Sequence, residues 1–202
     1  MIIYVTDFNK FSDEKSFLEN IKQSSLCGIE YIQIRLNSFD QKSKTILTEK
    51  INSVIDKNST KLIINSDYKS SKIISAYGFH ITSKSKLNGM DAKKISGANW
   101  ISKSIHSKEE VLFNNKDKDI NAFVIGTIFP SNSHPNGKTL GIENFKELVR
   151  LSKKPVIGIG GIGTNNIESI VNSGADGIAM ISELAFASNL RKIIMELKSY
   201  YD

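Results

Sequence analysis

The fold is indicated by residues 155–162, which read Pro155-Val156-Ile157-Gly158-Ile159-Gly160-Gly161-Ile162. A short β-branched strand runs here into two glycines, and a helix start follows. Residues 174–181, Gly174-Ala175-Asp176-Gly177-Ile178-Ala179-Met180-Ile181, repeat this design further along the chain. Two buried strands that each end in exposed backbone amides before a helix are typical of the phosphate-binding end of a (β/α)8 barrel. The pair therefore predicts a fold and a phosphorylated ligand.

The rest of the chain alternates short apolar runs with longer amphipathic runs, and its composition shows no break. This alternation predicts a parallel sheet in one domain that covers residues 1–202. Eight such units favour a closed (β/α)8 TIM barrel, and an open doubly wound sheet is the alternative. We expect strands at residues 2–6, 31–35, 61–65, 78–81, 100–104, 122–126, 156–159 and 177–181. We expect helices near residues 13–25, 40–57, 68–76, 90–96, 107–114, 142–152, 164–173 and 186–199.

The composition limits the kinds of binding partner that we expect for this protein. The chain has 202 residues, near the lower end for such barrels, and a net charge of +6. Its lysines are scattered along helical stretches, which favours solvated helix faces over a nucleic-acid surface. A single cysteine, Cys27, allows no intrachain disulfide, and the first residues lack the pattern of a signal peptide, so we expect none. No apolar run is long enough to predict a membrane crossing. We therefore expect a cytoplasmic protein with no nucleic-acid or membrane partner, and we leave a homo-oligomer open.

The chemistry of such barrels gathers where the strands end. Gln33 and Arg35 close the second strand, and alternation places both on one side of the sheet. Polar side chains that face into a barrel are costly unless they bind something, and a guanidinium can fork onto a carboxylate or a phosphate. The alternative is a structural arginine paired with a neighbouring carboxylate. Asn65 closes the third strand and offers a donor and an acceptor to a ligand, whereas Ser66 and Asp67 are better read as a helix cap.

Two histidines follow on the next strands. His80 lies inside the fourth strand, where a lone histidine is more often a satisfied core residue than a ligand. His106 follows the fifth strand and precedes Ser107-Lys108-Glu109-Glu110, which resembles a capping box. His106 therefore orients a loop in the simpler interpretation. It also lies at the correct end of the barrel to be a second catalytic candidate.

The longest predicted loop covers residues 126–141 after the sixth strand. Long loops without an apolar period are often functional, and this one carries hydroxyls, a histidine and a lysine. Such a loop can close over an anionic ligand and supply an acid or base. His134 is the best candidate for proton transfer, with a plain surface loop as the alternative. The candidate substrate contacts from this loop are Thr127, Ser131 and Ser133.

The last two strand ends supply the predicted phosphate site. Backbone amides of Gly160 and Gly161 and those of Ile181 and Ser182 can point at one phosphate. A double glycine alone is a weak signal. Two such turns on adjacent final strands are more specific.

Taken together, these strand ends resemble the thiamine-phosphate synthase/TenI superfamily of small barrels, over the whole chain. The motifs follow one another in the superfamily's order from the second strand to the eighth. They are Gln33-Ile34-Arg35, Ile63-Ile64-Asn65, Gly78-Phe79-His80, Ser104-Ile105-His106, Gly126-Thr127-Ile128-Phe129-Pro130-Ser131, Ile157-Gly158-Ile159-Gly160-Gly161-Ile162 and Gly174-Ala175-Asp176-Gly177-Ile178-Ala179.

The resemblance implies one of two activities. The synthase joins a pyrimidine diphosphate to a thiazole phosphate, releases pyrophosphate and uses magnesium. Members of the TenI type include thiazole tautomerases, which move a proton on a carboxythiazole phosphate and need no metal.

Four positions depart from the synthase pattern. Ser66 and Ser85 stand where that pattern has the aspartates that hold magnesium. Asn37 and His134 stand where it has lysines. A diphosphate leaving group develops charge that a metal or several cations must neutralise, whereas a tautomerase needs an acid or base and a phosphate anchor.

The departures therefore favour a TenI-like, metal-independent thiazole tautomerase that binds a phosphorylated thiazole and uses no cofactor. Arg35 and Asn65 would contact the thiazole, and His134 would shuttle the proton. One alternative is the synthase, with Asp67 rescuing a magnesium site. The other is a non-catalytic regulatory or binding protein of the TenI type.

Overall fold

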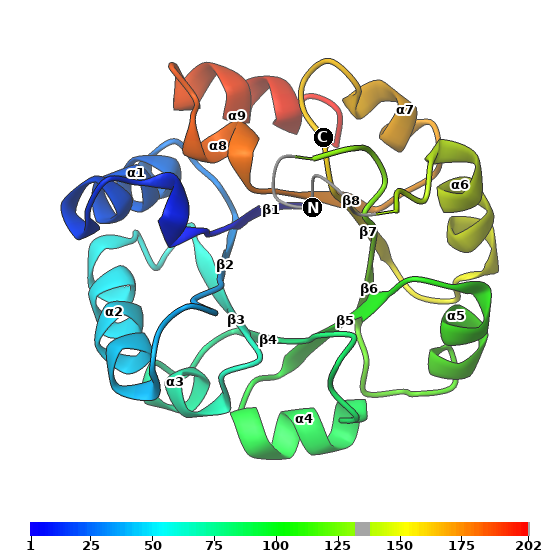
Figure 1. Cartoon of the computed structure of the whole chain (residues 1–202), viewed down its shortest axis with the longest axis horizontal. Helices are drawn as coiled ribbons and strands as arrows, with labels where there is room; N and C mark the ends of the chain where they lie inside the picture. Colours follow the sequence, from blue (N-terminus) through cyan, green and yellow to red (C-terminus); the bar gives the residue numbers. More distant parts are fainter. Residues whose placement is uncertain (132–137, 202) are drawn as a thin grey trace.

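The computed structural model describes residues 1–131 and 138–201. In it, eight parallel strands pair in sequence order, and β8 pairs with β1 to close a barrel (Figure 1). The predicted strands are confirmed to within one residue at each end, and the closed ring rules out the open sheet. The strands are β1 (Ile2–Val5), β2 (Tyr31–Ile34), β3 (Lys61–Asn65), β4 (Gly78–Ile81), β5 (Trp100–Ile105), β6 (Ala122–Ile125), β7 (Val156–Ile159) and β8 (Gly177–Met180).

The helices form a ring outside the strands (Figure 1). The helix predicted at 186–199 is found as α9, but it begins four residues later than predicted, at Leu190. The Asn189 side chain accepts from the amide of Lys192 at 3.0 Å and so starts a new helix. The helices are η1 (Phe8–Lys10), α1 (Glu14–Leu26), α2 (Gln41–Val54), α3 (Tyr68–Ile73), α4 (Gly89–Ser96), α5 (Lys108–Asn114), α6 (Ile142–Leu151), α7 (Ile167–Val171), α8 (Ser182–Ala185) and α9 (Leu190–Lys198).

The core has two layers. Large side chains such as Phe17, Phe79 and Phe145 fill the space between the strands and the helices. A second cluster fills the inside of the barrel, with members from β1, β3, β6, β7 and β8. These are Ile3, Val5, Ile63, Ala122, Val124, Ile157 and Ala179.

The strand register places polar side chains in that inner layer. Gln33 pairs with Val5 on one side and Ile63 on the other, and both partners belong to the inner cluster. Paired residues of parallel strands point to the same face, so Gln33 faces inward. Ser102 and Ser104 face inward by the same argument, since they pair with Ala122 and Val124. The inner layer is therefore apolar along β6, β7, β8 and β1, whereas β2 and β5 add Gln33, Ser102 and Ser104 to it, and β3 contributes the apolar Ile63.

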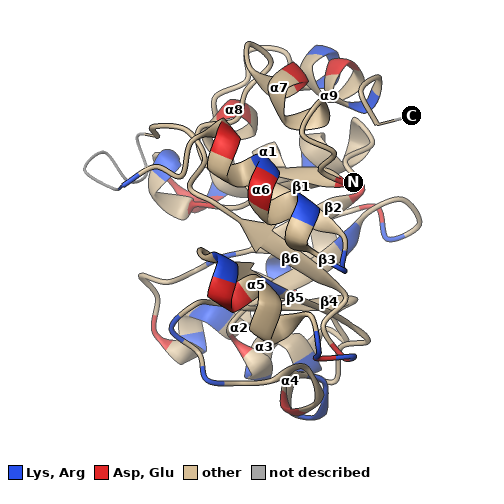
Figure 2. Ribbon diagram, turned by 90° about the vertical axis from the view of Figure 1, so that its right-hand side faces the viewer, with Lys and Arg blue, Asp and Glu red and all other residues tan. Residues whose placement is uncertain are grey.

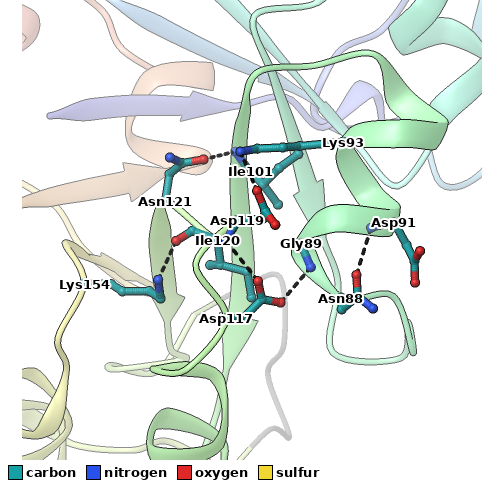
Figure 3. A network of polar contacts seen from close by, with 10 residues as sticks. All are labelled: Asn88, Gly89, Asp91, Lys93, Ile101, Asp117, Asp119, Ile120, Asn121 and Lys154. Carbon is teal, nitrogen blue, oxygen red and sulfur yellow. Dashed lines mark hydrogen bonds and ion pairs between the residues drawn. The ribbon is translucent and has the colours of Figure 1, made fainter.

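A network of side chains fixes α4 against the start of β6 (Figure 3). One carboxylate oxygen of Asp117 accepts from the amide of Gly89 at 2.7 Å, and the other accepts from the amide of Asp119 at 3.0 Å. Asp119 in turn accepts from the ammonium of Lys93 at 2.9 Å. Acceptors from the loop before β6 therefore hold α4 at two residues, Gly89 and Lys93.

Positions of Lys and Arg and positions of Asp and Glu are intermixed along the outer helices and loops in the ribbon of Figure 2. This arrangement fits the prediction that the lysines are solvated helix faces. Within the described ranges, no helix combines the length and the hydropathy that a membrane crossing requires.

Candidate active site

Gln33 and Arg35 reach the carboxyl end of β2 with their side chains unpaired. Gln33 is only 4% exposed, yet its amide group has no hydrogen-bond partner among the described residues. Arg35 is half-buried, and its guanidinium forms no ion pair within residues 1–131 and 138–201. Its backbone amide donates to Thr6 Oγ1 at 3.0 Å, which fixes the chain at this point. The structural-arginine alternative therefore finds no support in the described part of the chain, and both side chains are available to a ligand.

The residues at the end of β3 have two roles: Asn65 is a candidate site residue, and Asp67 caps α3. Asn65 Oδ1 accepts from the hydroxyl of Ser66 at 3.2 Å, and Ser66 lies 3.4 Å from Thr82 Oγ1. Asp67 caps α3, because its carboxylate accepts from the amide and the hydroxyl of Ser70. It also accepts from Gln41 Nε2 at 3.1 Å. The cap prediction for Asp67 is confirmed.

The residues at this end do not fit the magnesium site that the resemblance implies. Magnesium is held by carboxylates in a near-octahedral shell, and serine hydroxyls stand at positions 66 and 85. The carboxylate of Asp67 accepts hydrogen bonds from Ser70 and Gln41 in the described structure. The described residues contain no group of three His, Cys, Asp or Glu that could hold a metal ion.

His80 lies on β4 inside the barrel and is bonded through both ring nitrogens. Its Nδ1 lies 2.9 Å from Ser102 Oγ, and its Nε2 lies 2.9 Å from Ser104 Oγ. Burial lowers the pKa of His80 to about 4, with a smaller contribution from nearby His106. The ring is therefore neutral near pH 7, and the interpretation as a satisfied core histidine is confirmed. Sequence reasoning missed the two serines, although alternation along the fifth strand could have placed them on one face.

His106 is exposed just beyond β5 and holds the end of β6. Its Nδ1 donates to the backbone oxygen of Gly126 at 2.6 Å, and its amide donates to Glu110 Oε2 at 2.6 Å. Ser107 caps α5 by accepting from the amide of Glu110 at 3.3 Å. The capping box is therefore only half formed, because Glu110 bonds His106 in place of Ser107. His106 orients the loop, and its Nε2 has no partner among the described residues.

The loop after β6 is anchored at its base. Thr127 O accepts from the amide of Leu140 at 2.8 Å, and the amide of Phe129 donates to Gly160 O at 3.0 Å. Thr127 and Ser131 are half-buried, and Thr127 lies against Gly160 just after β7. Ser133 and His134 lie outside the described residues.

The predicted phosphate turns have free amides. In the described ranges, no acceptor takes the backbone N–H groups of Gly160, Gly161, Ile181 or Ser182. Gly160 and Gly161 have φ values of +103° and +65°. A Cβ at Gly161 would lie 2.5 Å from Pro130 O, so a side chain has no room there. The turn after β7 therefore exposes its amides because it is made of glycine.

A carboxylate joins the two turns without competing for their amides. Glu183 Oε1 accepts from the amide and the hydroxyl of Thr164, both at 3.3 Å. This links the residues that follow Gly160 and Gly161 to the start of α8. The carboxylate of Glu183 therefore bonds Thr164 and not the amides of Gly160, Gly161, Ile181 or Ser182.

The closed ring of eight parallel strands with helices outside it defines the protein as a (β/α)8 barrel. A family model described as thiamine monophosphate synthase matches residues 2–184, and the chain belongs to that family.

Individual relatives agree. The chain is 28% identical over 196 residues to a thiamine-phosphate synthase from Clostridium tetani, over 97% of this chain and 92% of the relative. It is 30% identical over 207 residues to a thiamine-phosphate synthase from Dictyoglomus turgidum, over 98% and 91% of the two chains. Among solved structures, a thiamine phosphate pyrophosphorylase from Pyrococcus furiosus superposes with a TM-score of 0.83 at 23% identity, over 99% and 94% of the chains.

The prediction of a thiazole tautomerase is wrong. These full-length relatives are named as synthases, so the comparisons favour the synthase alternative. The error arose because Ser66, Ser85, Asn37 and His134 were given more weight than the pattern that the chain keeps. The superfamily is confirmed, and its TenI branch is not specifically supported.

Proposed function

We propose that the protein is a thiamine-phosphate synthase that joins a pyrimidine diphosphate to a thiazole phosphate and releases pyrophosphate. One observation carries this proposal. The similarity to the Clostridium tetani synthase covers 97% of this chain and 92% of that protein. It therefore includes the strand ends from which the candidate site is built, and not the barrel framework alone.

Two separate groups of candidate binding residues lie at the carboxyl ends of the strands, and this arrangement supports a reaction with two substrates. The amides of Gly161 and Ser182, which no described acceptor takes, follow β7 and β8, whereas Gln33 and Arg35, whose side chains have no described partner, lie at the end of β2. The inner polar residues continue from β2 to β5, and within this group β3 lies across the ring from β7 (Figure 1). We propose that the amide turns bind the phosphate of the thiazole. The β2–β5 side then binds the pyrimidine and its diphosphate.

Arg35 is the described cation best placed to stabilise the leaving group. Negative charge develops on the diphosphate as its bond to the pyrimidine breaks, and a preorganised donor in a partly dry site stabilises that charge. An unpaired guanidinium offers two parallel donors to such an anion. We propose that coupling proceeds with no magnesium ion held by protein carboxylates. Asn65, Thr127 and Ser131 line the same mouth and are proposed substrate contacts.

Pyrophosphate release provides the first test. The full chain is incubated with both substrates and, as controls, with each substrate alone. We expect release only when both are present, because the thiazole phosphate is the acceptor. Release from the pyrimidine diphosphate alone would indicate hydrolysis and would exclude coupling. Release that never exceeds the enzyme-free rate would also reject the proposal.

A further inference from the structure

The inner faces of β4 and β5 hold a buried hydrogen-bond chain that runs toward the barrel mouth. Its members are Ser102, which is 1% exposed, His80, which is 3% exposed, and Ser104, which is half-buried. The two serine oxygens bond opposite nitrogens of one neutral ring. One nitrogen of a neutral imidazole donates and the other accepts, so the two serines cannot have the same role.

The hydroxyl hydrogens decide between the two tautomers. Ser102 makes no other hydrogen bond with a described residue and is closed off from solvent. If Nδ1 carried the proton, Ser102 would accept, and its own hydrogen would be buried without an acceptor, which is costly. If Ser102 donates to Nδ1, the hydroxyl hydrogen of Ser102 and the ring N–H of His80 both have acceptors. The second arrangement places the ring proton on Nε2.

We propose that His80 is a positioning residue whose Nε2–H donates to Ser104 Oγ, so that the hydroxyl hydrogen of Ser104 is directed to an acceptor on the substrate. The lone pairs of Ser104 are then directed at the ring, and its hydrogen is available at the half-buried mouth. The opposite tautomer would make Ser104 an acceptor for the substrate. His80 thus determines the polarity of this contact without touching the substrate.

The identity of that substrate rests on the proposed synthase function, but the tautomer does not. The substrate acceptor is a pyrimidine ring nitrogen or a diphosphate oxygen on the β2–β5 side of the mouth. Ser102 determines the tautomer of His80, because a buried hydroxyl donor at Nδ1 requires the ring proton to be on Nε2.

The first experiment reads the tautomer directly. The full chain is labelled with ¹⁵N-histidine, and the ring signals of His80 are assigned by comparison with His106→Gln and His134→Gln, which leave His80 in place. At neutral pH we expect a pyridine-like Nδ1 and a protonated, pyrrole-like Nε2. A protonated Nδ1 would overturn the proposal. This spectrum needs no substrate, so absence of synthase activity would reject the proposed function and leave the tautomer result standing.

The second experiment tests the consequence for Ser104. We expect Ser102→Ala to mix the two tautomers in the spectrum and to lower the kcat of coupling by roughly tenfold, the weight of one hydrogen bond. In a Ser104→Ala background the same change should cost nothing more, because its target hydroxyl is gone. Equal losses in both backgrounds, or no loss in either, would contradict the positioning role.

Ser71→Ala is the matched control. Ser71 is also fully buried and its hydroxyl has no partner among the described residues, but it lies on α3 outside the barrel. It removes the same atom from a buried position and should leave both the His80 spectrum and kcat unchanged. A shift of the His80 signals in this variant would mean that the tautomer responds to general packing, which would also count against the proposal.

Discussion

Arg35 and Gln33 differ from several polar side chains near the barrel mouth, because no described residue pairs with their side chains. Asp67, Glu183 and His80 are each bonded to neighbouring groups and so have structural roles. Burying an unpaired polar group is unfavourable, and a ligand that completes the hydrogen bonds recovers that cost. The unpaired side chains are therefore the better guide to the ligand.

We predict that Arg35→Ala lowers the kcat/KM of coupling by roughly tenfold to hundredfold. The loss corresponds to one charge-assisted hydrogen-bonded contact. Arg35→Lys keeps the charge but not the fork and should fall in between. Steady-state kinetics measure the effect. Arg191→Ala is the control, because Arg191 is exposed on α9. An Arg35→Ala variant with unchanged kinetics would remove Arg35 from the site.

We predict that His80 makes the protein less stable in mild acid. Its pKa in the fold is about 4, against an ordinary value near 6.5, so the unfolded chain takes up the proton first as the pH falls. The free energy of unfolding should be about 2 kcal/mol lower at pH 5 than at pH 7 from this group alone. Urea unfolding at the two pH values measures it. His80→Gln should lose most of this difference, and the same pH dependence in that variant would assign it to other groups.

The sequence allowed prediction of some of these residues and not of others. Gln33 and Arg35 could be found because alternation on one strand places them on one face. Ser102 and Ser104 required the register between β4 and β5, which no single strand reveals. The activity was mispredicted because absent carboxylates are conspicuous in a sequence, whereas the similarity spread along the chain is not.

The turn after β7 is defined by its backbone and not by its side chains. We predict that Gly161→Ala weakens binding of the thiazole phosphate by roughly tenfold to hundredfold, as expected when charge-assisted amide contacts are displaced. The added Cβ would meet Pro130 O at 2.5 Å and push the neighbouring loop away. Calorimetric titration with the thiazole phosphate measures the change.

Gly174→Ala is the control for this prediction. Gly174 has a φ of +81° with its nearest neighbour at 3.8 Å, so alanine there adds backbone strain without a clash. Both variants lose some stability for this reason. Equal affinities in Gly161→Ala and the unmodified protein would exclude this turn as the phosphate site.

The anchoring of α4 depends on one carboxylate. We predict that Asp117→Ala lowers the free energy of unfolding by about 1–3 kcal/mol, since the buried amide of Gly89 loses its acceptor. Urea unfolding measures it. Asp91→Ala, on the first turn of the same helix, removes a carboxylate that accepts no hydrogen bond in the described structure and should cost less than 1 kcal/mol. Equal losses would show that the network in Figure 3 does not hold α4.

The elements themselves were largely predictable. Most strands are short apolar runs bounded by turn residues, and such runs are typical of strands in a parallel sheet. The exception lies after β8, where the chain begins α8 at Ser182 and starts again at α9. The cap at Asn189 was overlooked because the apolar pattern around it was read as one helix.

The closed ring brings residues far apart in sequence to one mouth, including the two serines that replace the expected metal ligands. Ser66 has a φ of +62°, a conformation that aspartate also accepts, and both Ser66 and Ser85 lie beside Thr82. We predict that the double variant Ser66→Asp, Ser85→Asp gains a magnesium site. Its thermal midpoint should rise with magnesium concentration, and that of the unmodified protein should not. A rise in both proteins would reveal a metal site that we have not identified.

The central claim is that this barrel couples a pyrimidine diphosphate to a thiazole phosphate. The most direct measurement is mass spectrometry of the product formed by the full chain from the pyrimidine diphosphate and the thiazole phosphate. We predict a product with the mass of thiamine phosphate, formed together with an equal amount of pyrophosphate. Recovery of both substrates unchanged after incubation with active, folded protein would contradict the account.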